Sequence, residues 1–215
     1  MQNFIELIMQ QSITFFAILD PIGVSAIMLS LLHANVTKQE INKIAYKSTI
    51  TVVIAFFVVL IGGNFILKMF GIDENSLKVI GGIVLILMAI NMLQNTKEAK
   101  NITKEEDDDI NKQDDLSVIP IAIPITFGPG MFSTIIILKQ QASTIQDISA
   151  IIIAFLLNAL VMYMVFKRAL FIKEYLGVTG QNVVTKIMGL IVGAIAVQFI
   201  VSGVITLSVM YLSNN

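Results

Sequence analysis

The sequence predicts an all-α membrane protein, with six transmembrane helices arranged as two inverted-topology repeats of three helices each. Of its 215 residues, 56% are hydrophobic and 13% are charged, whereas soluble domains carry about 25% charged residues. The charges cluster between apolar stretches, several of which reach the roughly 20 residues that cross a bilayer. In addition, proline-glycine breaks recur in the two halves of the chain, around Pro21 and Pro129, which are 108 residues apart.

Six apolar segments are expected to cross the membrane, at residues 4–32, 48–67, 77–93, 116–138, 148–166 and 187–212. The first is expected to be a retained helix and not a signal peptide, because no Lys or Arg precedes Lys38 and the apolar run continues past Asp20. The first and fourth segments are broken, near residues 20–21 and 128–130 respectively. No segment alternates polar and apolar residues with a period of two, as the strands of a transmembrane barrel would.

Residues 95–115 differ from the rest of the chain, since they hold four Lys and eight acidic residues. Such a stretch cannot bury itself and predicts a cytoplasmic linker. The linker separates a first three-helix repeat, residues 1–94, from a second, residues 116–215. The acidic run at residues 105–109 lacks the ligand spacing and turn glycine of an EF-hand loop, so a solvated linker is preferred to a calcium site.

The distribution of Lys and Arg predicts the orientation in the membrane. With six spans, Lys68, Lys78 and Lys139 fall on the side that holds the amino terminus, and the other eleven Lys and Arg residues fall on the opposite side. The positive-inside rule assigns the opposite side to the cytoplasm. The chain is therefore expected to be a multi-pass protein of the plasma membrane with both termini outside the cytoplasm.

Three helices per half require the two halves to enter the membrane in opposite directions, as in an inverted repeat. A second match supports this arrangement: residues 81–84 (Gly-Gly-Ile-Val) and 189–192 (Gly-Leu-Ile-Val) have the same spacing as the two breaks. The alternative is chance similarity between apolar segments, in which Gly, Ile and Val are common.

The paired breaks predict a binding site, because Pro and Gly free backbone groups at a depth where only protein or a watery cavity can satisfy them. The half-helix that follows a break has a partially positive N-terminus, which suits a carboxylate. Freed carbonyl groups suit a cation or an ammonium group, so two opposed breaks suit a zwitterion. The alternative is a pair of packing kinks without a ligand. The candidate binding residues are Asp20, Pro21, Gly23, Gly128, Pro129, Gly130, Ser133 and Thr134.

Asp20 is the one acidic residue well inside a predicted membrane segment. Its burial as an anion costs about 2.5–3.5 kcal/mol on insertion scales, which points to a function. Three roles are open: a cap for the half-helix that begins at Pro21, a ligand for a substrate ammonium, or a carrier of a coupling proton. Ser133 and Thr134 follow the second break by one turn and are expected to line the site. Asn91, Asn158 and Gln198 are expected to join helices by hydrogen bonds.

Several functional classes are disfavoured. The chain has no Cys and a single His, His33, so no metal site is expected. The net charge of −1 gives no indication of nucleic-acid binding, and there is no nucleotide-binding loop. An enzyme would need a general acid and base or an activated nucleophile, and the membrane segments offer one acid. We therefore expect neither an enzyme nor a cofactor.

The breaks also carry a resemblance to a known family. Residues 20–23 (Asp-Pro-Ile-Gly), 120–124 (Pro-Ile-Ala-Ile-Pro) and 128–130 (Gly-Pro-Gly) resemble the paired signatures of the MarC family, which includes a small neutral amino acid transporter. The resemblance covers nearly the whole chain, although Ala26 stands where members usually carry Pro. It implies a secondary transporter of glycine, alanine and similar amino acids, coupled to protons. The alternative is an exporter of other small solutes or a membrane factor that does not transport. The oligomeric state is left open.

Overall fold

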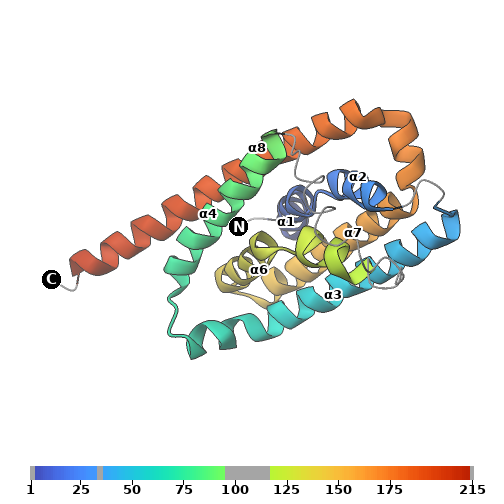
Figure 1. The fold of residues 1–215 in the computed structure, drawn as a ribbon. Helices are drawn as coiled ribbons and strands as arrows, with labels where there is room; N and C mark the ends of the chain where they lie inside the picture. Colours follow the sequence, from blue (N-terminus) through green and yellow to red (C-terminus); the bar gives the residue numbers. More distant parts are fainter. Residues whose placement is uncertain (1–2, 33–35, 95–116, 214–215) are drawn as a thin grey trace.

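The computed structural model describes residues 3–32, 36–94 and 117–213, and within these ranges the chain is helical and has no strand. The elements in chain order are α1 (Phe4–Leu19), α2 (Pro21–Leu31), α3 (Lys38–Met69), α4 (Glu74–Gln94), η1 (Ser117–Thr126), α6 (Pro129–Gln141), α7 (Ile145–Lys167) and α8 (Ala169–Ser213) (Figure 1). The predicted linker at residues 95–115 and the residue His33 lie outside the described residues.

The first break is a single residue, Asp20, between α1 and α2. Its backbone is left-handed, at φ 38° and ψ 61°, a conformation that Asp tolerates better than most residues. The Asp20 N–H donates to the carbonyl of Phe16 and closes α1, while the Asp20 carboxylate accepts from the Gly23 N–H at 3.1 Å and opens α2. Pro21 follows as the first residue of α2, where a missing N–H costs nothing. Asp20 is thus a helix cap.

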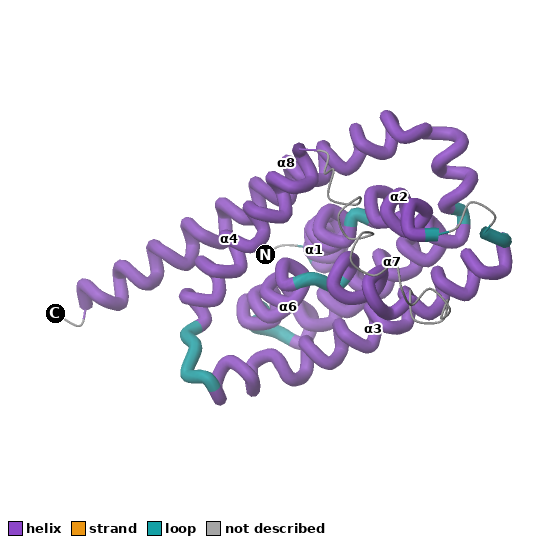
Figure 2. Tube along the Cα trace, in the orientation of Figure 1, coloured by secondary structure: helices purple, strands orange, loops and turns teal. Residues whose placement is uncertain are grey.

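The second break is longer than predicted, because the irregular backbone extends through η1. Ile119 and Ile123 have extended conformations, with φ,ψ of −123°,123° and −132°,125°. Each precedes a proline, and proline disfavours the helical region for the residue before it. The two parts, residues 119–126 and α6, meet at a bend of 51°. Figure 2 shows short non-helical joints beside α2 and α6.

Two helices begin well before the apolar segments that predicted them. Helix α3 starts at Lys38 and not near residue 48, because Thr37 and Glu40 form a capping box that satisfies the first backbone donors. Helix α8 starts at Ala169 and not near residue 187, and it turns at Gly177, where φ is 63°. Hydropathy identifies only the part of a helix that lies in hydrocarbon, so both polar beginnings were missed.

The helices pack in pairs that join distant parts of the chain. Helix α4 lies along α8, α1 packs against α7, and α3 packs against α7, η1 and α6. The far end of α8 projects beyond the other helices (Figure 1). At the centre, the rings of Phe56 and Phe155 stack with centroids 3.8 Å apart, and Phe15 meets Phe155 edge-on at 5.3 Å. Such aromatic pairs contribute about 0.5–1.5 kcal/mol each beyond the area they bury.

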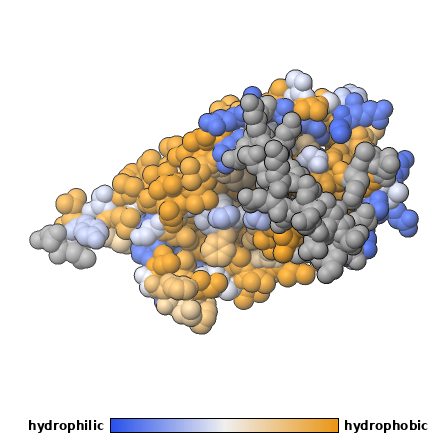
Figure 3. All heavy atoms as spheres, in the orientation of Figure 1, coloured by the Kyte–Doolittle hydropathy of each residue, from blue (hydrophilic) through white to orange (hydrophobic). Residues whose placement is uncertain are grey.

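The outer surface is that of a membrane protein. Large apolar side chains are exposed along the helices; Ile61 and Phe65, for example, are 75% and 71% exposed. In Figure 3, apolar residues cover much of the visible face, and hydrophilic residues gather at the end where α3 begins and α8 turns. Within the described residues, five helices can span a membrane if α1 and α2 count as one, and the bent pair of η1 and α6 would be a sixth.

Candidate functional site

A cavity of about 730 Å³ lies between the two helix breaks. Its wall is formed by the end of α1, most of α2, the second half of α4, the joint between η1 and α6, and the start of α8. This volume is in the range of small-molecule sites in proteins. The breaks are far apart in the sequence, and the cavity brings them to one place.

The cavity contains five of the eight residues predicted to form the site. They are Asp20, Gly23, Gly128, Pro129 and Gly130. Pro21 is buried at the start of α2 and is not part of the wall.

Ser133 and Thr134 do not line the cavity, contrary to the prediction. Both side chains are buried in the packing of α6. The Thr134 hydroxyl donates to the Gly130 carbonyl at 2.7 Å, and the Ser133 hydroxyl donates to the same carbonyl at 3.1 Å. Hydroxyl groups in helices commonly find such a carbonyl three or four residues back, so these two need no ligand.

Asp20 is the acidic group of the cavity and is 6% exposed. Besides the Gly23 N–H, its carboxylate accepts a hydrogen bond from the Thr185 hydroxyl of α8. The described residues that line the cavity include no Lys or Arg. The carboxylate therefore has polar partners but no cation in the wall around it.

Gly23 allows α2 and α8 to come this close. A Cβ atom at Gly23 would lie 2.5 Å from the Thr185 Oγ1 and would also strike the Asp20 carboxylate. Any larger residue must displace one of these groups, since real Cβ atoms do not approach other atoms so closely. The glycine is thus required by the geometry of the Asp20–Thr185 hydrogen bond.

The start of α8 contributes the polar residues that the sequence analysis missed. They are Gln181, Asn182 and Thr185. The predicted sixth segment began only at residue 187, so these positions were treated as outside the membrane. Gln181 and Thr185 are four residues apart, which puts them on one helix face. This spacing was the signal that could have identified them.

The other predicted polar side chains have separate locations. Asn158 joins α7 to α1, because its Nδ2 donates to the Ser12 carbonyl at 3.1 Å, and its expected role between helices is confirmed. Asn91 lines the cavity. Gln198 is exposed on α8, and its expected hydrogen bond between helices stays a prediction.

The N-terminus of α6 differs from that of α2. No side chain caps α6, because its N-cap is Gly128, whereas Asp20 caps α2. The first backbone donors of a helix have no partner within it, and Gly130 and Met131 of this first turn lie in the cavity wall. The cavity therefore has a carboxylate on one wall and an uncapped helix N-terminus on another.

The cavity lies on one side of the two breaks. Its remaining lining residues run toward the ends of α2 and α4 and the start of α8. On the other side the helices are in close contact: a Cβ at Gly81 would lie 2.8 Å from the Ser133 Cβ, and one at Gly63 would lie 2.6 Å from the Ile136 Cγ1. We refer to the side that the cavity reaches as the open side and to the side with these two contacts as the closed side.

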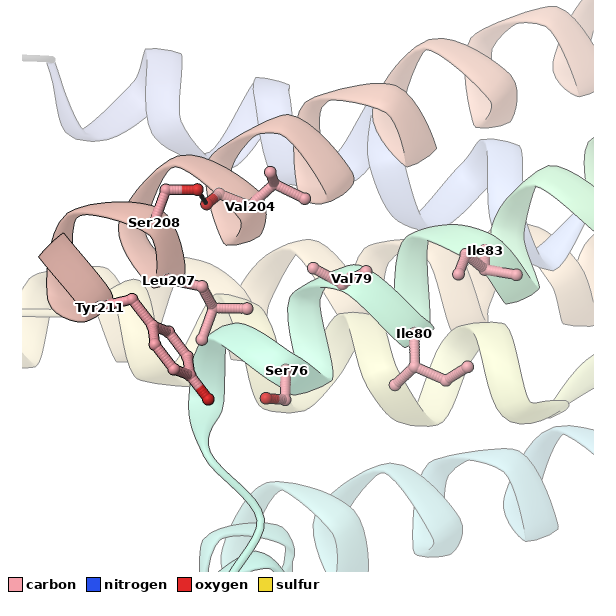
Figure 4. Close-up of a pocket in the computed structure, with 8 residues that line it drawn as sticks. All are labelled: Ser76, Val79, Ile80, Ile83, Val204, Leu207, Ser208 and Tyr211. Carbon is pink, nitrogen blue, oxygen red and sulfur yellow. Dashed lines mark hydrogen bonds between the residues drawn. The ribbon is translucent and has the colours of Figure 1, made fainter.

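A second depression, of about 500 Å³, lies between α4 and α8 near the C-terminal end of the chain (Figure 4). Most of its side chains are aliphatic, and the Ser208 hydroxyl donates to the Val204 carbonyl of its own helix. The described residues in its wall include no carboxylate, amine or amide side chain. The cavity at the breaks is therefore the better candidate site. Within residues 3–32, 36–94 and 117–213, no three His, Cys, Asp or Glu side chains are grouped as metal ligands would be.

Comparison with known proteins identifies a family of integral membrane proteins. Residues 5–208 match the sequence profile described as "MarC family integral membrane protein". The chain is 32% identical to a UPF0056 membrane protein of Aquifex aeolicus, over 94% of each chain. It is 35% identical to the UPF0056 membrane protein YvbG of Bacillus subtilis, over 89% of this chain and 90% of that one.

A third relative, the UPF0056 membrane protein YhcE of Escherichia coli, is 30% identical over 89% of both chains. No solved structure matches the chain. Because the profile and these relatives each cover nearly the whole sequence, the chain belongs to the MarC family of integral membrane proteins.

Proposed function

We propose that this protein is a secondary transporter of small neutral amino acids such as glycine and alanine, coupled to protons, in the plasma membrane. The observation that carries the proposal is the cavity between the two breaks, with Asp20 on one wall and the uncapped N-terminus of α6 on another. A binding site at helix breaks inside a membrane protein is a recurring feature of secondary transporters.

The two walls suit the two charges of an amino acid. The Asp20 carboxylate would accept hydrogen bonds from the substrate ammonium, which forms three. The N-terminus of α6 would attract the substrate carboxylate through its partial positive charge and its free N–H groups. Much of the remaining wall is apolar, including Ile27, Leu87 and Met88, and suits an uncharged side chain. Asp20 could also carry the coupling proton.

Alternating access would follow from two inverted repeats, in which the halves exchange roles. The helix contacts are consistent with such a relationship. The packing of α1 on α7 corresponds to the packing of η1 and α6 on α3. Likewise, the packing of α2 on α8 corresponds to the packing of α6 on α4. If the two halves are equivalent in this way, each contact in one pair has a counterpart in the other.

The charge distribution suggests which side the cavity faces. The open side holds the start of α3 and the turn between α7 and α8, where Lys38, Lys43, Lys47, Lys167 and Arg168 occur. Under the positive-inside rule this side is cytoplasmic. The described conformation would then be inward-facing, with both termini outside the cytoplasm.

A competing function is export of a larger solute, and the volume of the cavity favours it. About 730 Å³ is enough for a drug-sized ligand, and is more than glycine or alanine needs. We expect neither an enzyme nor a bound cofactor. A membrane factor that transports nothing is the remaining alternative.

Uptake of radiolabelled alanine into proteoliposomes tests the proposal. Uptake should be concentrative when a pH gradient is imposed and should cease when a protonophore removes it. Excess unlabelled glycine should compete, and larger apolar solutes should not. Uptake of larger labelled solutes without alanine uptake would favour the exporter, and absence of all uptake by folded protein would contradict a transporter.

A further inference from the structure

Gln181 occupies an unusual position at the start of α8. Its side chain is 2% exposed and borders the cavity between the breaks. Its amide Nε2 is buried and has no hydrogen-bond partner within the part of the chain that the structure describes. A buried donor without an acceptor destabilises a protein, and this cost is retained where the donor serves a ligand.

Gln181 differs from the other residues that have a buried polar atom without a partner. In the described part of the chain, the other side-chain atoms without a partner are oxygens, those of Gln11, Ser12, Thr49, Asn64 and Gln140. None of these five residues lines the cavity. Gln181 is therefore the one residue of this group that combines an unused N–H donor with a place in the cavity wall.

The neighbours of Gln181 define what it can bind. Thr185, one turn further along α8, donates its hydroxyl to Asp20, and Asn182 also borders the cavity. An amide Nε2 donates and cannot accept, and it therefore needs an oxygen. The Asp20 carboxylate already receives hydrogen bonds from Thr185 and Gly23. A carboxylate or carbonyl oxygen of a bound molecule would supply the acceptor that the Gln181 donor lacks.

We propose that Gln181 is a substrate-contacting, specificity-determining residue, whose Nε2 donates a hydrogen bond to a carboxylate oxygen of the substrate. The inference rests on the proposed function and refines it. A carboxylate has two oxygens, so one can face Gln181 while the other faces the N-terminus of α6, which also borders the cavity. Gln181 thereby distinguishes amino acids from amines, which lack the acceptor.

The Gln181→Met substitution separates this role from a structural one. Methionine has nearly the same length and shape and removes the unpartnered donor. If Gln181 serves only the packing, the variant should keep the transport KM and should be as stable as the wild type or more so. If Gln181 binds substrate, the KM for alanine should rise about tenfold or more, as expected when one hydrogen bond to a charged group is lost. Gln198→Met is the matched control, because Gln198 is exposed on the same helix.

The experiment measures alanine uptake in proteoliposomes and thermal stabilisation of the purified proteins by alanine, propionate and isopropylamine. Alanine carries both charged groups, propionate carries only the carboxylate, and isopropylamine carries only the amine. We expect Gln181→Met to lose stabilisation by alanine and propionate and to keep any stabilisation by isopropylamine. Gln181→Glu should lose alanine uptake more severely, because its carboxylate repels that of the substrate.

Each outcome separates the inference from the function on which it rests. A normal alanine KM in Gln181→Met would overturn the role of Gln181 and leave amino acid transport intact. Stabilisation of the wild type by propionate, lost in Gln181→Met, without any alanine uptake would support the carboxylate contact and overturn amino acid transport. If no probe stabilises the wild type and none is taken up, both proposals are wrong.

Discussion

Gly82 of α4 and Gly189 of α8 make reciprocal contacts in the pairing of these two helices. A Cβ at Gly82 would lie 2.7 Å from the carbonyl oxygen of Ala196, and one at Gly189 would lie 3.2 Å from that of Ala89. The two glycines are 107 residues apart in the sequence, as are the two alanines. Each helix thus approaches the backbone of the other at an equivalent point, and small residues are what permit such close packing in a membrane.

Substitution at this contact should destabilise the protein. Gly82→Ala places a methyl group against backbone, which cannot move aside like a flexible side chain, and we expect a loss of about 1–3 kcal/mol. Gly193→Ala is the control on the same interface, because its Cβ would meet the Ala89 Cβ at an ordinary 3.6 Å. Thermal unfolding in detergent should show a lower Tm for Gly82→Ala alone. Equal Tm values in the two variants would contradict the reciprocal contact.

Asp20→Asn should separate the capping role from transport. Asn is as good an N-cap as Asp and also tolerates the left-handed backbone, so the Tm should stay near that of the wild type. The negative charge is lost, and concentrative alanine uptake should be abolished. Asp20→Ala should lose uptake and also about 1 kcal/mol of stability through the missing cap. Wild-type uptake by Asp20→Asn would show that Asp20 is a cap and nothing more.

Gly23→Ala should displace the Asp20 carboxylate without changing any charge. The added methyl group would overlap that carboxylate and the Thr185 hydroxyl. We expect alanine uptake to fall about tenfold or more, in line with the loss of a hydrogen bond to a charged group. Gly62→Ala serves as the control, because no atom lies within 4 Å of its added Cβ. Normal uptake by Gly23→Ala would mean that the Asp20–Thr185 hydrogen bond is dispensable.

Thiol labelling should reveal the open side of the cavity. The chain contains no Cys, so each introduced Cys is the sole target of a membrane-impermeant maleimide. Ser30→Cys and Asn182→Cys, both in the cavity wall, should react in inside-out vesicles. Asn3→Cys, at the exposed amino terminus, should react in intact cells.

Ser133→Cys provides the reference for the closed side, since Ser133 is buried against Gly81. It should stay unlabelled from either side unless substrate or a pH gradient changes the conformation. Labelling of the Ser30 and Asn182 positions from outside the cell would reverse the predicted orientation.

The sequence by itself determined the features that depend only on residues close together along the chain. Long apolar runs required transmembrane helices, because hydrocarbon offers the backbone no hydrogen bonds other than its own. The pair Asp20-Pro21 predicted that one helix ends and another begins here. The Asp20 side chain can cap the second helix, and the Pro21 ring fits its first turn. Both effects act within a few residues, so they could be predicted without knowing the fold. Five of the eight predicted site residues, all at or beside the two breaks, lie in the cavity wall.

The tertiary structure alone decided which groups face that cavity. Ser133 and Thr134 were predicted to line it, but their hydroxyls bond to a carbonyl of their own helix and are buried by neighbouring helices. Gln181 and Thr185 enter the cavity because α8 turns at Gly177 and packs against α2, with Gly23 leaving room for Thr185. Such proximity depends on contacts between residues more than 150 positions apart. The spacing of Gln181 and Thr185 indicates that they share a helix face, but not what that face contacts.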